Sequence, residues 1–472
     1  MAIAVYSSLL MTMSMPSEAA QHLDSWPYQR EHQAAWAHST VSGTQGASLT
    51  PSGQSPLPSI MGVAGNPDSW KTPEFNADWG LGAMNAHYAY ARGLTGSGIR
   101  LGVFDSGTGL AHSEFSNKDH RSIRIADLLP DGSRCSNTVA VDGPDACFAT
   151  DGGQVSVTHN TFDSSVPQSE IDRISENIRK RDGGITTYAN HGTHVGGTIA
   201  ANRDGLGMHG VSFGANLTVA KKLNNKVTRH WYENGSTDSS TLSVFDGRSS
   251  IIDLYDQMNA QNVRAINHSW GLISEPTNAS QLDFWYGYDS NPEDYGAYAN
   301  GSRAKGMIQV WAAGNSGPNS SPQKSPIAGS YATLPRALPD IEPYWLSVVN
   351  VKNDLTLSET SHKCGLSANW CIAAPGTDIN STIYALSSRL SASVSKDVNG
   401  NTALTVTRGT PGSGYKLESG TSMAAPHVTG ALGLLFERFP YLTNAQVRDV
   451  LLTTARDLGA PGVDEIYGWG MV

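Results

Sequence analysis

The chain has 472 residues, with 32 Lys and Arg against 42 Asp and Glu, and therefore a formal net charge of −10. A chain of this length has volume for one large domain or two ordinary ones, and its acidic balance disfavours a nucleic-acid partner. The 49 Gly residues and a charged fraction of only 16% indicate a loop-rich globular protein rather than a helical bundle or a disordered acidic chain.

The N-terminal segment has the composition of a leader. Its first 20 residues are mildly apolar and end in small residues, as a signal peptide does, but the first basic residue is Arg30, so the positively charged start is missing. Residues 20–75 are rich in Ser, Gly, Pro and Gln without a sustained period, which predicts a flexible lead-in. We therefore expect residues 1–75 to be a leader remnant and lead-in, followed by one domain over 76–472. No later stretch approaches the roughly 20 apolar residues that a membrane span needs.

From residue 76 onward, apolar strands alternate with helical patterns. This alternation predicts an α/β three-layer sandwich, in which a mostly parallel central sheet is flanked by helices. Near the C-terminus, Thr443 to Gln446 forms a capping-box pattern that predicts the start of the last helix. The other predicted elements are, in chain order, a helix at 81–92, a strand at 99–105, a helix after 191, a strand at 217–223, a helix at 250–261, a strand at 264–269, a helix around 295–305 and a strand at 307–313.

Two segments interrupt this alternation and are expected to be insertions on the core. Residues 106–190 are long and polar and contain two cysteines. Residues 378–417 contain two segments of alternating polarity around a turn at Asn399-Gly400, which predicts a β-hairpin.

The four cysteines form two local pairs, Cys135 with Cys147 and Cys364 with Cys371. Neither pair has the CxxC spacing of zinc or thioredoxin-like redox sites, so those functions are the weaker interpretation. Two short-range disulfides are predicted, and they fit an exported protein.

Candidate catalytic residues stand where predicted strands end and helices begin, which is where ligands gather on parallel sheets. Asp105 ends an apolar strand in VFDSGTG, although an Asp at such a position is more often a turn former or helix cap. His191 and His194 open a helix in HGTHVGG. The Glu of the HExxH zinc motif is absent between them, so no metal site is predicted.

Ser422 and Asn315 are candidates for a nucleophile and an oxyanion donor. Ser422 stands at a predicted helix start in ESGTSMAAPHVTG, where unpaired N–H groups favour developing negative charge, although such a hydroxyl is by default an ordinary N-cap. Asn315 follows a buried strand in WAAGN, and its amide could donate to an oxyanion, although GNSG alone is an ordinary turn. His427 is the nearest imidazole in sequence to Ser422, but we expect it to project away from the hydroxyl.

The order Asp105, His191, Ser422 is that of the subtilisin triad, and it differs from the orders in chymotrypsin and in α/β-hydrolases. With VFDSGTG, HGTHVGG, INHSWG, AAGN and SGTSMAAPHVTG in register, residues 80–472 resemble the subtilisin-like serine proteases, or subtilases. The resemblance implies that Asp105 orients His191, which is the general base and acid, that Ser422 is the nucleophile and that Asn315 is the oxyanion donor. It also implies a substrate cleft lined by Ser269, Trp270, Gly271, Ala312, Ala313 and Gly314.

More narrowly, the segment before Asp105, the pair Cys364 and Cys371 before AAPG, and the terminal YGWGMV resemble passenger domains of Gram-negative autotransporter serine proteases. In those proteins an outer-membrane β-barrel follows the catalytic domain, whereas this sequence ends at Val472 before any barrel. The resemblance implies a serine endopeptidase that is secreted or held at the surface of a Gram-negative bacterium and cleaves proteins or peptides. We expect a monomer with no certain cofactor, because subtilases often bind calcium but no Asp/Asn-rich loop here assigns a calcium site.

Two other functions fit the sequence less well. A catalytically silent subtilase-like adhesin or binding module is disfavoured because every triad position holds the right type of side chain. An exported esterase or lipase of the α/β-hydrolase class is disfavoured because it requires a GxSxG elbow and another motif order. The gap of 85 residues between Asp105 and His191 is longer than in compact subtilases. Because of this gap the sequence does not predict the shape of the rim of the cleft, but the gap does not affect the assignment of the triad.

Overall fold

The computed structural model describes residues 62–126, 149–151, 158–162, 169, 187–223, 226–233, 236–243, 248–272, 275–288, 291–316, 325–386, 390–396, 402–408 and 411–472. The chain divides into two units, residues 1–55 and 56–472, and every described residue belongs to the second. The predicted leader up to residue 61 and the predicted disulfide between Cys135 and Cys147 lie outside the described residues.

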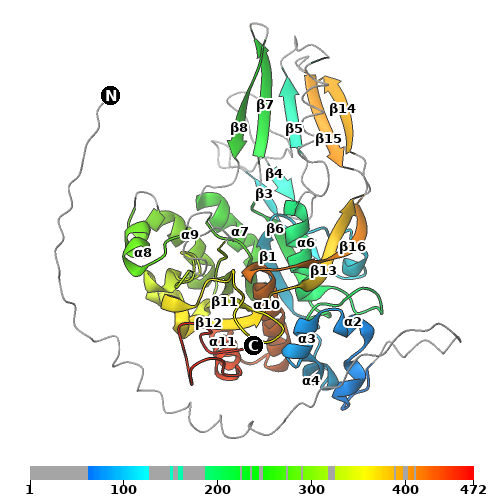
Figure 1. Cartoon of the computed structure of the whole chain (residues 1–472). Coiled ribbons are helices and arrows are strands. Elements are labelled where there is room, and N and C mark those ends of the chain that lie inside the picture. The colour runs from blue at the N-terminus through cyan, green and yellow to red at the C-terminus, as the bar shows by residue number, and fades with distance from the viewer. Residues whose placement is uncertain are drawn as a thin grey trace, which may run out of the picture. The chain divides into compact units, whose positions relative to one another are not determined.

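A seven-stranded sheet lies at the centre, and all of its neighbouring strands run parallel (Figure 1). Strand β1 sits between β9 and β6, so its carboxyl end, where Asp105 stands, lies well inside the sheet. The predicted parallel sheet is therefore confirmed. The order across the sheet is β12 (Cys371–Pro375), β11 (Trp345–Val351), β10 (Ile308–Ala312), β9 (Ala265–His268), β1 (Arg100–Asp105), β6 (Asn216–Lys221) and β2 (Arg121–Ser122).

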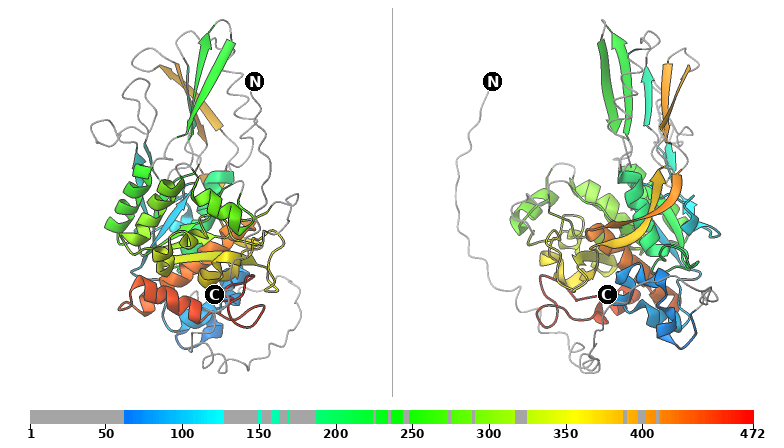
Figure 2. Two further views of the ribbon diagram at one scale, coloured as in Figure 1. Left: turned by 90° about the vertical axis from the view of Figure 1, so that its left-hand side faces the viewer. Right: turned by 45° about the vertical axis from the view of Figure 1, so that its right-hand side comes forward.

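Helices cover both faces of this sheet (Figures 1 and 2), which confirms the three-layer α/β architecture. Strand residues alternate between the faces, as strand geometry requires: Leu101 and Val103 pack in one core cluster and Phe104 in the other. The first cluster includes residues of α6 (Thr187–Ala200), α10 (Thr421–Arg438) and α11 (Asn444–Thr453), and the second includes residues of α7 (Arg248–Ala260), α8 (Ala279–Tyr286) and α9 (Asn291–Arg303).

The single helix predicted at 81–92 is wrong, because the structure has two short helices there, α3 (Trp79–Ala83) and α4 (Ala86–Ala91). Asn85 separates them with a left-handed φ of 58°, a conformation that Asn tolerates better than most residues. Helix α6 also begins at Thr187, before His191 rather than after it.

Packed structure begins before residue 76, the predicted start of the domain. Helical turns η2 (Pro67–Trp70) and α2 (Pro73–Asn76) precede that point. The rings of Trp70 and Phe75 lie 5.8 and 6.3 Å from the ring of Tyr90, so both side chains belong to the core under α4.

The predicted hairpin within 378–417 is confirmed as β14 (Leu390–Lys396) and β15 (Thr402–Arg408), which pair in antiparallel register. It continues from a second antiparallel pair, β13 (Ile379–Leu386) with β16 (Pro411–Glu418). Strand β15 also pairs with β5 (Thr158–Phe162), which comes from the first insertion, and β7 (Lys226–Glu233) and β8 (Ser236–Ser243) complete a five-stranded sheet, seen at the top of Figure 1. The short strands β3 (Arg124–Ala126) and β4 (Ala149–Asp151) pair with each other.

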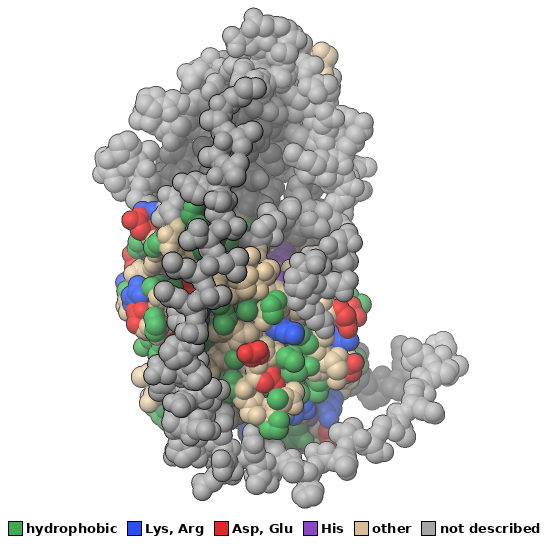
Figure 3. All heavy atoms as spheres, turned by 60° about the vertical axis from the view of Figure 1, so that its left-hand side comes forward, with side chains coloured by type: hydrophobic (Ala, Val, Ile, Leu, Met, Phe, Trp, Pro, Cys, Tyr) green, Lys and Arg blue, Asp and Glu red, His purple; other side chains and the backbone are tan. Residues whose placement is uncertain are grey.

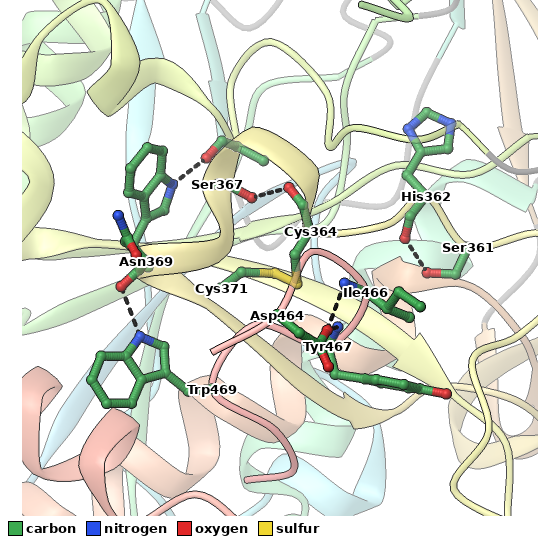
Figure 4. The surroundings of a disulfide bond; sticks show 12 residues. Ser361, His362, Cys364, Ser367, Asn369, Cys371, Asp464, Ile466, Tyr467 and Trp469 are labelled. Carbon is green, nitrogen blue, oxygen red and sulfur yellow. Dashed lines mark hydrogen bonds between the residues drawn. A yellow bond between two sulfur atoms is a disulfide. The ribbon is translucent and has the colours of Figure 1, made fainter. Parts of the chain in front are cut away.

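The predicted disulfide between Cys364 and Cys371 is confirmed, and it closes the 3-10 helix η6 (Gly365–Trp370) (Figure 4). The indole of Trp370 donates to the carbonyl of Ala332, and the indole of Trp469 donates to the carbonyl of Asn369, both at 2.8 Å. The disulfide therefore holds a turn that connects β12 to the C-terminal loop. The capping box predicted at Thr443 and Gln446 is also present, at the start of α11.

Charged groups are dispersed on the face of the molecule that Figure 3 shows. Lys and Arg side chains lie there among acidic, hydrophobic and other side chains rather than in one basic patch. Within the described part of the chain, no helix is both long enough and apolar enough to cross a bilayer.

Replacing both cysteines of the disulfide, Cys364→Ser with Cys371→Ser, is expected to lower the free energy of unfolding by about 2–3 kcal/mol. The loss is at the modest end for disulfides because the crosslink spans a sequence separation of only 7 and so constrains the unfolded chain little. Urea unfolding of the oxidised wild type and the double variant measures the difference. An unchanged unfolding midpoint would show that this crosslink does not stabilise the domain.

Candidate active site

The side chains of Asp105 and His191 meet between the carboxyl end of β1 and helix α6. Nδ1 of His191 lies 2.9 Å from Oδ1 of Asp105, which is fully buried, while the imidazole keeps 27% of its surface exposed. The backbone N–H of Ser106 donates to the same carboxylate oxygen at 2.6 Å. Because a carboxylate accepts hydrogen bonds, Nδ1 carries a proton, and Nε2 is the basic atom of the neutral ring.

Glycine at position 192 allows the turn after β1 to lie directly against α6. A Cβ atom on Gly192 would lie 2.3 Å from the carbonyl oxygen of Gly107, a distance that no side chain tolerates. Two hydrogen bonds join the same segments, from the N–H of Gly192 to Oγ of Ser106 at 3.1 Å and from Oγ1 of Thr108 to the carbonyl of Gly192 at 3.0 Å. The residues that flank the two catalytic candidates thus interlock and fix the Asp105–His191 distance.

The electrostatic surroundings favour a protonated His191. Burial lowers its pKa, but the charge and hydrogen bond of Asp105, with a smaller contribution from the charge of Glu418, outweigh burial and raise the pKa above the ordinary 6.5. The pKa of His191 therefore lies on the basic side of an unperturbed imidazole.

His194, the second imidazole of the motif, has a different role. It is fully buried, and its Nε2 lies 3.0 Å from the carbonyl oxygens of both Ile379 and Lys416, so it anchors α6 to the pair β13 and β16. Burial lowers its pKa to about 4. Among the residues that the structure describes, no group of His, Cys, Asp and Glu side chains is arranged to hold a metal ion.

Ser422 is the second residue of α10 and is bonded reciprocally to the end of β9. Its Oγ donates to the carbonyl of Ser269 at 2.9 Å, and its own carbonyl accepts from Oγ of Ser269 at 2.8 Å. In a regular helix that carbonyl would accept from the N–H four residues later, but residue 426 is a proline and has none. The Ser269 hydroxyl supplies the missing donor, which explains why a proline is accommodated in this helix.

The prediction that His427 projects away from Ser422 is confirmed. His427 is fully buried, with Nδ1 2.8 Å from the carbonyl oxygen of Met423 and Nε2 3.0 Å from Oδ2 of Asp78. Asp78 also caps α3 by accepting from the N–H of Gly80. His427 therefore joins α10 to the segment that precedes β1.

Asn315 lies just beyond β10, and a hydrogen bond orients its amide. Its Oδ1 accepts from the N–H of Thr421 at 3.0 Å, so Nδ2 is the end that remains able to donate. The side chain is exposed. Gly314, just before it, has a φ of 106°, a conformation that favours glycine.

A cavity of about 290 Å³ brings several of the predicted residues together. Two of the predicted cleft residues do not line it: Ser269 is buried beneath Ser422, and Ala313 is buried in the core. The predicted site residues that do line the cavity are Trp270, Gly271, Ala312, Gly314, Asn315 and Ser422.

Trp270 forms a wall of this cavity rather than pointing away from it. Its indole N–H donates to the carbonyl of Phe104 at 2.8 Å, and its ring lies 5.0 Å from the rings of both Trp311 and Tyr331. The aromatic contacts on two sides leave the indole no room to rotate out of the wall.

The sequence did not point to several residues of the site. Glu275, Tyr331 and His362 line the cavity from loops that carry no motif, so no local signal could have identified them. Glu418, whose charge acts on His191, is the acid nearest in sequence to Ser422 and could have been considered on that ground.

Comparisons with known proteins identify the family of the chain. The profile of the Subtilase family matches residues 96–470. An extracellular serine protease of Serratia marcescens is 32% identical over 445 residues, covering 87% of this chain and 34% of that protein. The Neisserial autotransporter lipoprotein NalP of Neisseria meningitidis serogroup B is 24% identical over 428 residues, covering 82% of this chain and 33% of that protein. The chain thus spans about a third of the length of these curated relatives.

A solved protease structure from Pseudoalteromonas arctica PAMC 21717 superposes with a TM-score of 0.51 and 21% sequence identity, covering 85% of this chain and 96% of that one. It shares the fold. Since the family profile extends over most of the chain, and a relative at 32% identity aligns with 87% of it, the chain belongs to the subtilase family.

Proposed function

We propose that this chain is a serine endopeptidase in which Asp105, His191 and Ser422 form the catalytic triad. One observation carries the proposal: a buried carboxylate holds Nδ1 of a partly exposed imidazole at 2.9 Å, which leaves Nε2 as a base. The cavity shared by Ser422 and Asn315 supports it, because a nucleophile and an oxyanion donor must face one substrate carbonyl.

The first step is activation of the Ser422 hydroxyl. A serine hydroxyl is a weak nucleophile until a base accepts its proton. In the resting arrangement the hydroxyl donates to the carbonyl of Ser269. The proposed activation requires the hydroxyl to leave this bond and to donate to Nε2 of His191. As Oγ attacks the substrate carbonyl, His191 takes the proton, and the Asp105 carboxylate stabilises the imidazolium that forms.

The tetrahedral intermediate carries its negative charge on the former carbonyl oxygen. The Nδ2 group of Asn315 is available to donate to that oxygen, because Oδ1 is occupied by the N–H of Thr421. The backbone N–H of Ser422, in the first turn of α10, is the second donor, and the positive end of the helix dipole adds to it. His191 then gives its proton to the amine nitrogen, and collapse of the intermediate releases the amine and leaves an acyl-enzyme. Water hydrolyses the acyl-enzyme with His191 again as the base.

We also infer that the chain works outside the cytoplasm, secreted or at the cell surface. The matched relatives include proteins named as an extracellular protease and as an autotransporter lipoprotein. The disulfide between Cys364 and Cys371 fits this location, because disulfides persist in oxidising compartments.

The variant Ser422→Ala is expected to lower the turnover of a peptide substrate by about 10⁶-fold, because it removes the nucleophile of the triad. Release of a chromogenic leaving group measures the rate. Ser419→Ala is the matched control, since this nearby hydroxyl bonds to Asp378 and does not line the cavity. Activity near that of the wild type in Ser422→Ala would refute the assignment.

The pH dependence of kcat/KM gives a second prediction. The rate rises with pH as His191 loses its proton, and the midpoint lies above 6.5 because Asp105 and Glu418 raise the pKa of His191. Glu418→Gln removes one of these charges, which lowers the pKa and moves the acid limb to lower pH.

The pH profiles of the wild type, Glu418→Gln and the control Glu359→Gln test this prediction. Glu359 pairs with Lys352 on the surface, so its variant is expected to leave the limb in place. A shift of the limb to higher pH in Glu418→Gln, or the same shift in both variants, would contradict the electrostatic account of His191.

A further inference from the structure

Glu275 is the only acidic side chain among the described residues that line the cavity beside Ser422. Its Oε1 accepts from the N–H of Leu272 and its Oε2 from the N–H of Ser330, both at 2.9 Å. These bonds fix the carboxylate between the loop that follows β9 and the loop that follows β10.

Two glycines, Gly271 and Gly329, lie against this carboxylate. A Cβ atom on Gly271 would lie 3.0 Å from Oε1 of Glu275, and a Cβ atom on Gly329 would lie 2.8 Å from it. Any larger residue at position 329 would press on the carboxylate. The carboxylate thus occupies the space that side chains of the opposing walls would otherwise fill.

Among the described residues, no cation of the cavity lining balances Glu275. No Lys or Arg is among its described lining residues, and no cationic side chain of the described part of the chain contributes to the pKa of Glu275. Burial lowers the pKa of His362, the imidazole of the lining, to about 4, so this ring is neutral near pH 7. Burial raises the pKa of Glu275, and the N–H groups of Ser330 and Leu272 act in the opposite direction. A cation entering the cavity would favour the ionised carboxylate further.

Aromatic rings flank the same space. Trp270 and Tyr331 both line the cavity, and their ring centroids are 5.0 Å apart. The faces of such rings attract a guanidinium or ammonium group, and a guanidinium can also bind a carboxylate with two parallel hydrogen bonds.

We propose that Glu275 makes the cavity selective for a basic residue, Arg or Lys, immediately before the scissile bond. The inference rests on the proposed peptidase function, since it takes the cavity beside Ser422 as the place where that side chain binds. The cation of the substrate pairs with Glu275, and its aliphatic stem packs against Trp270.

The test uses five peptides that differ only in the residue before the scissile bond, which is Arg, Lys, Gln, Leu or Glu. The wild type is expected to cleave the Arg and Lys peptides with the highest kcat/KM. In Glu275→Gln, kcat/KM for these two falls by about 10- to 100-fold, whereas the Gln and Leu peptides change by less than about threefold. The Glu peptide is cleaved faster by the variant than by the wild type, because a like charge has been removed, and misfolding cannot produce that gain.

Glu293→Gln is the matched control, because it removes the same charge from an exposed residue of α9 outside the cavity. It is expected to keep the wild-type preference. An equal loss on all five peptides in Glu275→Gln would mean that Glu275 only braces the two loops, and would overturn the proposal.

A wild type that cleaves the Leu peptide as well as the Arg peptide would also overturn the selectivity proposal, while leaving the peptidase function intact. Failure of the wild type to cleave any of the five, together with no labelling of Ser422 by a serine-directed probe, would instead remove the peptidase function and the selectivity with it. The two failures are therefore distinguishable.

Discussion

The arrangement of the site depends on the need of the Ser422 carbonyl for a hydrogen-bond donor. Pro426, four residues later in α10, has no N–H to donate to it. The Ser269 hydroxyl satisfies it from the end of β9, and Asn267 in turn donates to that hydroxyl at 2.8 Å. Thr429, two turns into α10, donates to Oδ1 of the same Asn267 at 3.1 Å. Hydrogen bonds thus join α10 to the β9 segment at two positions along the helix. Because β9 pairs with β1, they tie the position of Ser422 to that of Asp105.

The opposite side of α10 is held by residues that precede β1. Asp78 and His427 form a buried pair, and removal of either partner would leave the facing atom of the other, Nε2 of His427 or Oδ2 of Asp78, without this contact in the core. The same carboxylate caps α3, so α3 and the helix of the proposed nucleophile share one polar contact. This contact ties the segment before β1 to the helix that holds Ser422.

The sequence predicted the features that depend on local pattern and failed where contacts join distant segments. The strands ending at Asp105 and Ala312 follow from apolar runs, and the proximity of Asp105 to His191 follows from the rule that sites form at the carboxyl ends of parallel strands. The break between α3 and α4 depends on the left-handed backbone of Asn85, which leaves no periodic signal. The five-stranded sheet and the place of Glu275 could not be predicted, because each depends on how loops far apart in sequence meet.

Site-mapped labelling with a fluorophosphonate tests most directly whether His191 activates Ser422. The account predicts one adduct per chain, located on Ser422 by peptide mass spectrometry, that forms faster as the pH rises through the raised pKa of His191. His191→Ala should abolish labelling at the same residue while the protein stays folded. A chain that forms no adduct, or one modified at other serines with Ser422 untouched, would contradict the account.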